Sequence, residues 1–362
     1  MKLSSPQAEI YGNDSMSALE AQRFAQFIAW SPVVFQVSYV MVKWGIFTLL
    51  SEHKEGLTID EVAEQKGISH YAAQILLEGS LVIGTVYLNK EGKFCIAKTG
   101  RFFTRDGMAL RDLNFNQDVN YLGLFSLEDA LKNGKPEGLK VFGSWPTIYE
   151  ALSSLPQQVQ KSWFGYDHYY SDNSFPEALK LVFSRPTRSL LDVGGNTGRF
   201  AVQCIDYNAD VKVTIMDLPQ QLDLMRQATN CHPSSERIGG FPANLLDDSQ
   251  AFPTGFDAIW MSQFLDCFSE EQVISILTRA AKSMSADSRL YIMETLWDRQ
   301  RFETASFSLA MASVYFTAMA NGNSKMFYSE DLIRMVRQAG LELDVIHDGL
   351  GLGHSLLVCK KA

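Results

Sequence analysis

The segment LLDVGGNTGRF at residues 190–200 joins an apolar strand to a helix through a glycine-rich turn that follows an acidic residue. Glycine lets the backbone approach a ligand closely, and the N-terminus of the following helix offers unpaired N–H groups. Asp217 ends the next predicted strand, 25 positions after Asp192. An acidic residue roughly 20 positions on commonly binds the ribose hydroxyls of a nucleotide. The segment therefore predicts a site for either a dinucleotide or S-adenosylmethionine.

The spacing within this turn favours S-adenosylmethionine. Dinucleotide sites follow the pattern G-x-G-x-x-G, whereas here Gly194 is followed by Asn196 and then Gly198. Asn tolerates the positive φ angle that a middle glycine would otherwise adopt. The carboxylate of Asp192 would repel a pyrophosphate, but it suits a ligand that carries a sulfonium and an ammonium group.

Alternating strands and helices follow the turn and predict the fold class. The predicted strands beyond residue 184 are RSLLDVG, VKVTIMD, FDAIWM, SRLYIMET, LELDVIHD and HSLLVCKK. With helices between most of them, they indicate an α/β domain with a doubly wound, mostly parallel sheet of the Rossmann type. Ligands of such sheets bind beyond the carboxyl ends of the strands.

Residues 57–105 have the order of a winged helix. LTIDEVAEQKG begins with the capping-box pair Thr58 and Glu61, a second helix follows, and TVYLNKEGKFCIAKT alternates about a turn as a hairpin wing does. The second helix, residues 69–83, contains no Lys or Arg, and the chain has a formal charge of -9. Because nucleic-acid contacts depend on basic residues, we expect a structural or dimerising unit rather than a DNA-binding one.

The apolar helices predicted before this unit indicate a partner subunit. Residues 24–46 carry more hydrophobic surface than one small domain covers, which favours a homodimer. The most hydrophobic window, residues 30–50, is interrupted by Pro32 and Lys43, so we expect buried helices rather than a membrane span. The five cysteines are scattered without a CxxC pair and no signal peptide is evident, which predicts a soluble, cytoplasmic protein.

These patterns divide the chain into three parts. We expect a winged-helix, all-α dimerisation domain over residues 1–107 and an aromatic-rich helical connector that lines the pocket over residues 108–180. The Rossmann-like domain that binds S-adenosylmethionine would follow over residues 181–362.

Several segments occurring in order resemble the small-molecule O-methyltransferases that use S-adenosylmethionine and carry an N-terminal winged-helix dimerisation domain, such as the plant caffeate and bacterial polyketide enzymes. They are LLDVGGNTGRFA, VTIMDLPQQLDLMR, ERIGGFPANLL, FDAIWMSQFLDCFSEEQVISILTRAAKSM, SRLYIMETL and MFYSEDLIRMVRQAGLEL. The likeness spans roughly residues 20–360. It implies methyl transfer to a small, aromatic, hydroxylated acceptor. No His/Asp/Glu cluster has the spacing of metal ligands, so we expect no metal.

The resemblance assigns a set of residues to the cofactor, in addition to Asp192: Gly194, Gly195, Gly198, Asp217, Leu218, Asn244, Leu245 and Ser262. The glycines would cradle the methionine part, and Asp217 would hold the ribose. Asn244 with Leu245 would contact the adenine, where the family usually has Asp before an apolar residue; the amide oxygen of Asn can still accept a hydrogen bond from the exocyclic amine. Ser262 stands where the family often has Lys.

The segment SQFLDCFSEEQ at residues 262–272 departs from the family. A Leu-His-Asp-Trp-like segment stands there in the family, and its His removes the acceptor's proton, because a phenolate attacks the sulfonium well and a neutral phenol poorly. Here that His falls on Asp266. An exposed Asp with a pKa of about 3.9 is a weak base for a phenol near 10, with an uphill transfer of about 8 kcal/mol.

Three interpretations of Asp266 remain open. It could be a buried base with a raised pKa, or the acceptor could already be ionised so that orientation suffices. Alternatively, the protein could bind S-adenosylmethionine for another reaction or for ligand sensing, with methyl transfer lost. Glu294 matches a Glu that orients the catalytic His in the family, Glu330 falls near a second such Glu, and His168 could serve as a substitute base.

Overall fold

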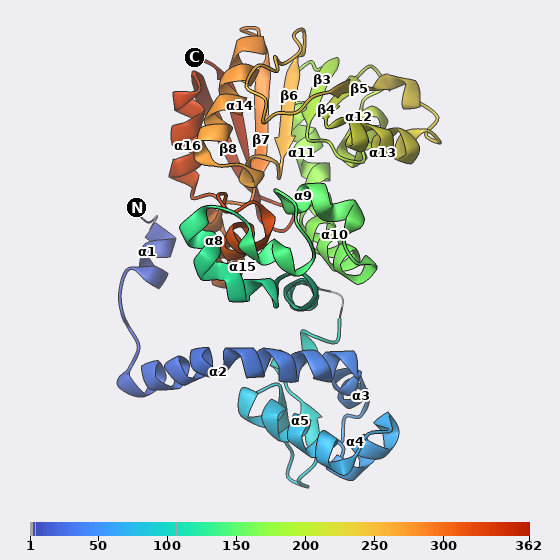
Figure 1. Cartoon of the computed structure of the whole chain (residues 1–362), viewed down its shortest axis with the longest axis vertical. Coiled ribbons are helices and arrows are strands. Elements are labelled where there is room, and N and C mark those ends of the chain that lie inside the picture. Colours follow the sequence, from blue (N-terminus) through green and yellow to red (C-terminus); the bar gives the residue numbers. More distant parts are fainter. Residues whose placement is uncertain (1–2, 4, 106) are drawn as a thin grey trace. The chain divides into compact units, whose positions relative to one another are not determined.

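The computed structural model describes residue 3 and residues 5–105 and 107–362, which form two compact units (Figure 1). The N-terminal unit comprises Tyr11–Tyr121 and Pro156–Tyr166. The C-terminal unit comprises Leu122–Leu155 and Asp167–Ala362, with a leading segment that ends at Ile10. The three-part division expected from the sequence, with boundaries after residues 107 and 180, stays a prediction.

The N-terminal unit has the element order of a winged helix. Its elements are α2 (Ala18–Lys43), α3 (Ile46–Glu52), α4 (Ile59–Lys66), α5 (His70–Ile83), β1 (Val86–Leu88), β2 (Phe94–Ile96), α6 (Lys98–Arg101) and α7 (Met108–Phe115). The predicted capping box begins α4: Thr58 Oγ1 accepts from Glu61 N at 3.2 Å, and the Glu61 carboxylate accepts from Thr58 N at 2.7 Å. The antiparallel pair β1–β2 is the predicted wing.

Helix α2 differs from the sequence-based expectation. It is one continuous helix that contains Pro32, and it is long and apolar enough to cross a membrane by length and composition alone. Only 11% of its most apolar window is buried, so the expectation of buried helices is wrong for the single chain. Its exposed side chains include Phe27, Ile28 and Trp30, at 46%, 57% and 61%.

A seven-stranded sheet forms the centre of the C-terminal unit, in the order β5-β4-β3-β6-β7-β9-β8. The strands are β3 (Ser189–Val193), β4 (Lys212–Asp217), β5 (Ile238–Pro242), β6 (Ala258–Ser262), β7 (Arg289–Glu294), β8 (Leu341–Leu350) and β9 (His354–Lys361). The first five are parallel, and β9 runs antiparallel to β7 and β8. Strand β5 was not among the predicted strands, because IGGFP has two glycines and a proline and little strand signal.

Helices cover both faces of this sheet (Figure 1). On one face lie α11 (Phe175–Val182), α12 (Arg199–Tyr207) and α13 (Pro219–Thr229), and on the other lie α14 (Glu270–Ser283) and α16 (Ser329–Gln338). Successive strand residues alternate between the two cores: Trp260 packs with the first group and Met261 with the second. The predicted doubly wound α/β fold is therefore confirmed.

The strand order reverses between β3 and β6. From β3 the chain continues outward through β4 to β5, and it then returns to β6 on the other side of β3. The residues that follow these two strands therefore meet at the carboxyl edge of the sheet, which is where doubly wound sheets bind ligands.

Further α-helices complete the described part of the chain. They are α1 (Ser5–Tyr11), α8 (Leu127–Asn133), α9 (Ile148–Ala151), α10 (Gln157–Ser171) and α15 (Glu303–Tyr315), the last continuing into a π-helical turn, Phe316–Ala320. The end of α10, from Asp167 onward, belongs to the C-terminal unit, as do α9 and α15.

Candidate cofactor and acceptor site

The glycine-rich turn after β3 has the backbone that its sequence predicts. Gly194, Asn196 and Gly198 have positive φ angles of 71°, 50° and 80°. Gly194 N donates a hydrogen bond to Met216 O at 2.9 Å, which fixes the turn to β4. Asn196 thus takes the left-handed conformation that a glycine would otherwise supply.

Asp217 ends β4 and is anchored to this turn. Its Oδ2 accepts from Asn196 N at 3.0 Å, and its Oδ1 accepts from Leu218 N at 2.7 Å. Burial raises the pKa of Asp217, and these two hydrogen bonds oppose the rise. Each carboxylate oxygen keeps a further lone pair, which suits a pair of ribose hydroxyls.

Asp192 lies buried beneath the turn, with 2% of its surface exposed. Among the residues that the structure describes, none forms a hydrogen bond with its Oδ2. A Cβ atom on Gly195 would lie 2.6 Å from that oxygen, so only glycine fits there without a shift. Burial, with a contribution from Asp217, raises the pKa of Asp192 to about 8. An orphaned acidic group of this kind fits a cationic ligand, because a nearby positive charge would restore its ionised form.

The chain after β6 crosses the same edge of the sheet. Gln263 follows Ser262 with a φ of 45°, and the ring of Phe264 lies over the glycine turn. A Cβ atom on Gly194 would lie 2.3 Å from that ring. The structure thus brings Ser262 and the glycine turn to neighbouring positions, as their places after β6 and β3 predict.

Asn244 and Leu245 follow β5 at this edge. Asn244 is exposed, and its Oδ1 accepts from Leu246 N at 3.0 Å. The side chain of Leu245 is 8% exposed and belongs to the core under the sheet edge. The amide of Asn244, which its own loop holds in place, could flank a purine ring together with the apolar side chain of Leu245.

Asp266 lies in the short 3₁₀ turn Leu265–Cys267 between β6 and α14, and it is 4% exposed. Burial raises its pKa to about 6, although a hydrogen bond from Cys267 Sγ to its Oδ1, at 3.5 Å, acts in the opposite direction. It does not cap α14, because Ser269 and Gln272 form the capping box there. Asp266 is therefore a buried acidic group that titrates near neutral pH.

Glu294 braces the turn that carries Asp266. It ends β7, is 1% exposed, and its Oε1 accepts from Phe264 N at 3.1 Å and from Leu265 N at 2.9 Å. Burial, followed by the charge of Asp266, raises its pKa well above the ordinary value. Glu294 is therefore a buried group at the end of β7 and not a solvated surface charge.

Asp167, which the sequence did not single out, joins the same electrostatic cluster. It lies in the last turn of α10, and its pKa is raised to about 7 by burial and then by Asp266. The only sequence signal was an acidic residue within the aromatic-rich helix GYDHYY. A carboxyl group whose pKa is raised by burial and by a neighbouring carboxylate is a common feature of acid–base sites.

His168 follows on the same helix, but the charged groups that affect its pKa are different ones. Burial and then Arg199 lower its pKa, so its imidazole is neutral at neutral pH. Arg199, at the start of α12, forms an ion pair with Asp172. The charges that affect the pKa of His168 thus belong to this ion pair, whereas the pKa of Asp167 is affected by Asp266.

Tyr149 on α9 completes the acidic cluster. Its hydroxyl is buried beside the thiol of Cys267, and burial, followed by Cys267, Tyr315 and Asp266, raises its pKa well above 10. It therefore remains a hydroxyl at neutral pH and can donate a hydrogen bond within the cluster.

Glu330, which the sequence placed near a second supporting Glu, is not part of the buried acidic cluster. Glu330 is exposed in the first turn of α16, so a role beside Asp266 is not supported. Over the described part of the chain, no group of three His, Cys, Asp or Glu side chains is arranged to hold a metal ion.

Comparison with known proteins agrees with this geometry. Residues 22–94 match a Dimerisation2-like domain, and residues 125–342 match an O-methyltransferase domain. An L-tyrosine C(3)-methyltransferase of Streptomyces lavendulae is 25% identical over 308 residues, which are 84% of this chain and 82% of that protein. A demethylspheroidene O-methyltransferase of Cereibacter sphaeroides is 25% identical over 72% of this chain and 67% of its own.

Solved methyltransferases share the fold. The S-adenosylmethionine-dependent methyltransferase SibL aligns with a TM-score of 0.70 and 23% identity over 92% of this chain and 98% of its own. The O-methyltransferase NcsB1, solved with S-adenosylmethionine and a hydroxylated naphthoic acid, aligns with a TM-score of 0.65 and 15% identity over 91% and 96%. The O-methyltransferase match covers more than half of the chain. The protein therefore belongs to the O-methyltransferase domain family and is an S-adenosylmethionine-dependent methyltransferase with an N-terminal dimerisation domain.

Proposed function

We propose that the protein methylates a hydroxyl group of a small aromatic acceptor, with Asp266 as the general base. The observation that carries this proposal is the buried Asp266, held by the Glu294-braced turn next to the glycine-rich turn. When bound, S-adenosylmethionine supplies a methyl group on a positively charged sulfur.

The cofactor contacts follow from the same edge of the sheet. Gly194, Gly195 and Gly198 would line the methionine part, with Asp192 as the buried counter-charge. Asp217 and Leu218 would hold the ribose, and Ser262 would lie near the cofactor. Asn244 and Leu245 would flank the adenine. The positive φ angles of the turn and the unpaired oxygen of Asp192 support this assignment.

Burial makes Asp266 a better base than an exposed Asp. Its pKa of about 6 reduces the difference from a phenol to about 4 units, or about 5 kcal/mol, in place of about 8 kcal/mol. The acceptor's O–H bond breaks and its proton moves to an Asp266 carboxylate oxygen. The acceptor oxygen then forms the bond to the methyl carbon as the carbon–sulfur bond breaks, which leaves a methyl ether and S-adenosylhomocysteine.

Two neighbours would assist this step. Tyr149, whose hydroxyl is un-ionised at neutral pH, would orient the acceptor oxygen or the Asp266 carboxylate. Asp167 would keep a second exchangeable proton nearby. His168 is the alternative base, because its lowered pKa leaves it unprotonated at neutral pH.

The test is release of S-adenosylhomocysteine by the purified protein from S-adenosylmethionine and a panel of phenols and catechols. We expect turnover, and we expect Asp266→Asn to lower kcat by roughly 100- to 10,000-fold while S-adenosylhomocysteine still binds. Unchanged turnover in Asp266→Asn would eliminate Asp266 as the base, and the matching His168→Asn variant would then identify His168. Cofactor binding with no product across the panel would favour the alternative in which methyl transfer is lost.

Methylation of a ring carbon is a second candidate. It is favoured by the 25% identity to the L-tyrosine C(3)-methyltransferase over 84% of this chain. The same removal of a phenol proton by Asp266 would raise the electron density at the ring carbons ortho to the oxygen. One of them would form the bond to the methyl carbon as the carbon–sulfur bond breaks, and loss of its ring proton to a base or to solvent would restore the aromatic ring. NMR of the methylated product distinguishes the two, since an ether and a C-methyl group give different carbon shifts.

We also propose that the protein is a homodimer and is cytoplasmic. Exposed apolar side chains of α2 and the Dimerisation2-like match over residues 22–94 support the dimer. Light scattering should give twice the chain mass for the wild type and one chain mass for Ile28→Asp. Tyr207→Asp, at a similarly exposed position on α12, is the matched control and should remain dimeric. Five free cysteines among the described residues fit a reducing compartment.

A further inference from the structure

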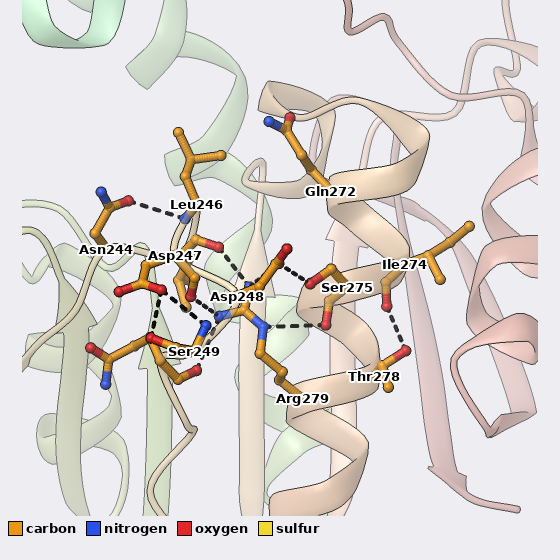
Figure 2. A network of polar contacts seen from close by, with 12 residues as sticks. Asn244, Leu246, Asp247, Asp248, Ser249, Gln272, Ile274, Ser275, Thr278 and Arg279 are labelled. Carbon is orange, nitrogen blue, oxygen red and sulfur yellow. Dashed lines mark hydrogen bonds and ion pairs between the residues drawn. The ribbon is translucent and has the colours of Figure 1, made fainter.

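A polar network anchors the loop that follows β5, the loop to which the adenine is assigned (Figure 2). Its centre is Arg279 on α14, which is 9% exposed. The Nη2 atom of Arg279 donates to Leu245 O at 2.6 Å, and its Nη1 donates to Asp247 O and Gln250 O at 3.0 Å each. One guanidinium thus holds three backbone carbonyls along six residues of the loop.

The charge of Arg279 is compensated mainly by these carbonyls. The nearest carboxylate, that of Asp248, lies 4.0 Å from Nη2 and is 82% exposed. A buried cation is unfavourable unless its hydrogen-bonding groups are satisfied. The planar fork of Arg can reach three separate oxygens, whereas the single ammonium of Lys cannot reproduce that arrangement.

Apart from the core packing of Ala243 and Leu245, few other hydrogen bonds among the described residues join this loop to the rest of the unit. Residues 243–250 contain no helix or strand, and Asn244 bonds within the loop, to Leu246 N. Ala243 N donates to Asp217 O at 2.9 Å, and Ser275 Oγ donates to Asp248 Oδ1 at 2.5 Å. Arg279 therefore supplies three of the contacts that hold the loop to α14, beside the single one from Ser275 (Figure 2).

We propose that Arg279 is a positioning residue for the cofactor: it holds the backbone of the loop so that Asn244 and Leu245 keep the geometry that recognises adenine. Arg279 would act indirectly, through its hydrogen bond to the Leu245 carbonyl, without touching the cofactor. The inference rests on the proposed assignment of Asn244 and Leu245 to the adenine.

The test measures the affinity for S-adenosylhomocysteine and for its inosine analogue, in which the exocyclic amine is replaced, by calorimetry on the full chain. In Arg279→Met we expect the affinity for S-adenosylhomocysteine to fall by roughly 10- to 100-fold. The preference for the adenine compound over the inosine compound should fall as well, while the KM for the acceptor stays unchanged. Arg279→Lys should be intermediate, because it keeps the charge but not the fork.

The matched control is Arg334→Met on α16, where an Arg that is 43% exposed pairs with Glu270. It should bind both compounds as the wild type does. Should Arg279→Met not fold, Arg279→Lys is the milder substitution, since it keeps the charge and loses only the fork. A smaller loss of the same preference is expected there.

Wild-type affinity in Arg279→Met, or in Arg279→Lys where the first variant does not fold, would overturn the inference. An equal loss of cofactor and acceptor affinity, with the adenine preference retained, would also overturn it, because it indicates general loosening of the fold. A wild-type protein that binds S-adenosylhomocysteine without preferring it over the inosine compound would instead remove the adenine assignment itself.

Discussion

Glu294 Oε1 accepts a hydrogen bond from the backbone N–H of Leu265 at 2.9 Å, and this contact fixes the turn that carries Asp266. Glu294 accepts from Phe264 N through the same oxygen. A residue at the end of β7 thus sets the position of the acidic group that follows β6.

Glu294→Gln should retain much of the activity, because the amide oxygen can still accept both bonds. Glu294→Ala leaves two buried N–H groups unpaired, at about 1–3 kcal/mol each. We expect Glu294→Ala to lower kcat at least tenfold and to lower the free energy of unfolding, measured by urea denaturation. Equal activities of the two variants would contradict a positioning role.

The pH dependence of kcat/KM should report the base. Asp266 has a pKa of about 6 and acts only when deprotonated, so kcat/KM should rise as the pH increases through about 6 and then level off. Asp167, with a pKa of about 7, would broaden this rise. In Asp266→Asn the rise near pH 6 should be absent at the much lower residual rate. If the rise near pH 6 persisted in Asp266→Asn, a group other than Asp266 would be the base.

His354 should make the folded state acid-sensitive. It begins β9, is fully buried, and its Nδ1 contacts Ser174 Oγ at 2.7 Å. Burial lowers its pKa from 6.5 to about 4, so the folded state binds fewer protons than the unfolded state between these values. Its contribution is fully present above about pH 6.5 and is lost as the pH falls to about 4, with a magnitude of about 3 kcal/mol.

Urea denaturation of the wild type and of His354→Asn between pH 4 and 7 isolates the contribution of His354 to the free energy of unfolding. The difference in unfolding free energy between the two proteins should shrink as the pH falls. A constant difference across this range would show that His354 does not titrate as its burial predicts. The comparison is needed because acidic groups with raised pKa values, such as Asp192, act in the opposite direction.

Gly195→Ala should weaken cofactor binding. The new Cβ would lie 2.6 Å from Asp192 Oδ2 and would push the carboxyl group away from the turn. We expect the affinity for S-adenosylhomocysteine to fall at least tenfold by calorimetry. Gly239→Ala is the control, because its nearest neighbour, Thr214 Oγ1, would be at 3.8 Å. Unchanged affinity in Gly195→Ala would argue against Asp192 as the counter-charge.

The sequence predicted those features that depend on local chemistry. The capping box of Thr58 and Glu61 begins a helix as expected, and the glycine turn adopts positive φ angles at Gly194 and Asn196. Alternation of strands and helices predicted the sheet except for β5, because the central strands β3, β6 and β7 are apolar along most of their length.

Features that depend on distant partners could not be predicted. Asp167 becomes part of the site only because the end of α10 and the turn after β6 belong to one electrostatic cluster. The anchoring of the loop by Arg279 joins residues 29 to 34 positions apart. The exposure of α2 was also mispredicted, because its apolar composition is that of a buried helix. In the proposed dimer, a second chain would bury its exposed apolar side chains.

The most direct measurement of the central claim, that buried Asp266 removes the acceptor's proton, compares wild type and Asp266→Asn on phenols of graded acidity. Rates of S-adenosylhomocysteine formation would be measured at saturating S-adenosylmethionine. We expect the variant to lose most activity with the least acidic phenols and little with phenols that are already ionised at the assay pH. A loss of equal size across the series, or no loss at all, would contradict this claim.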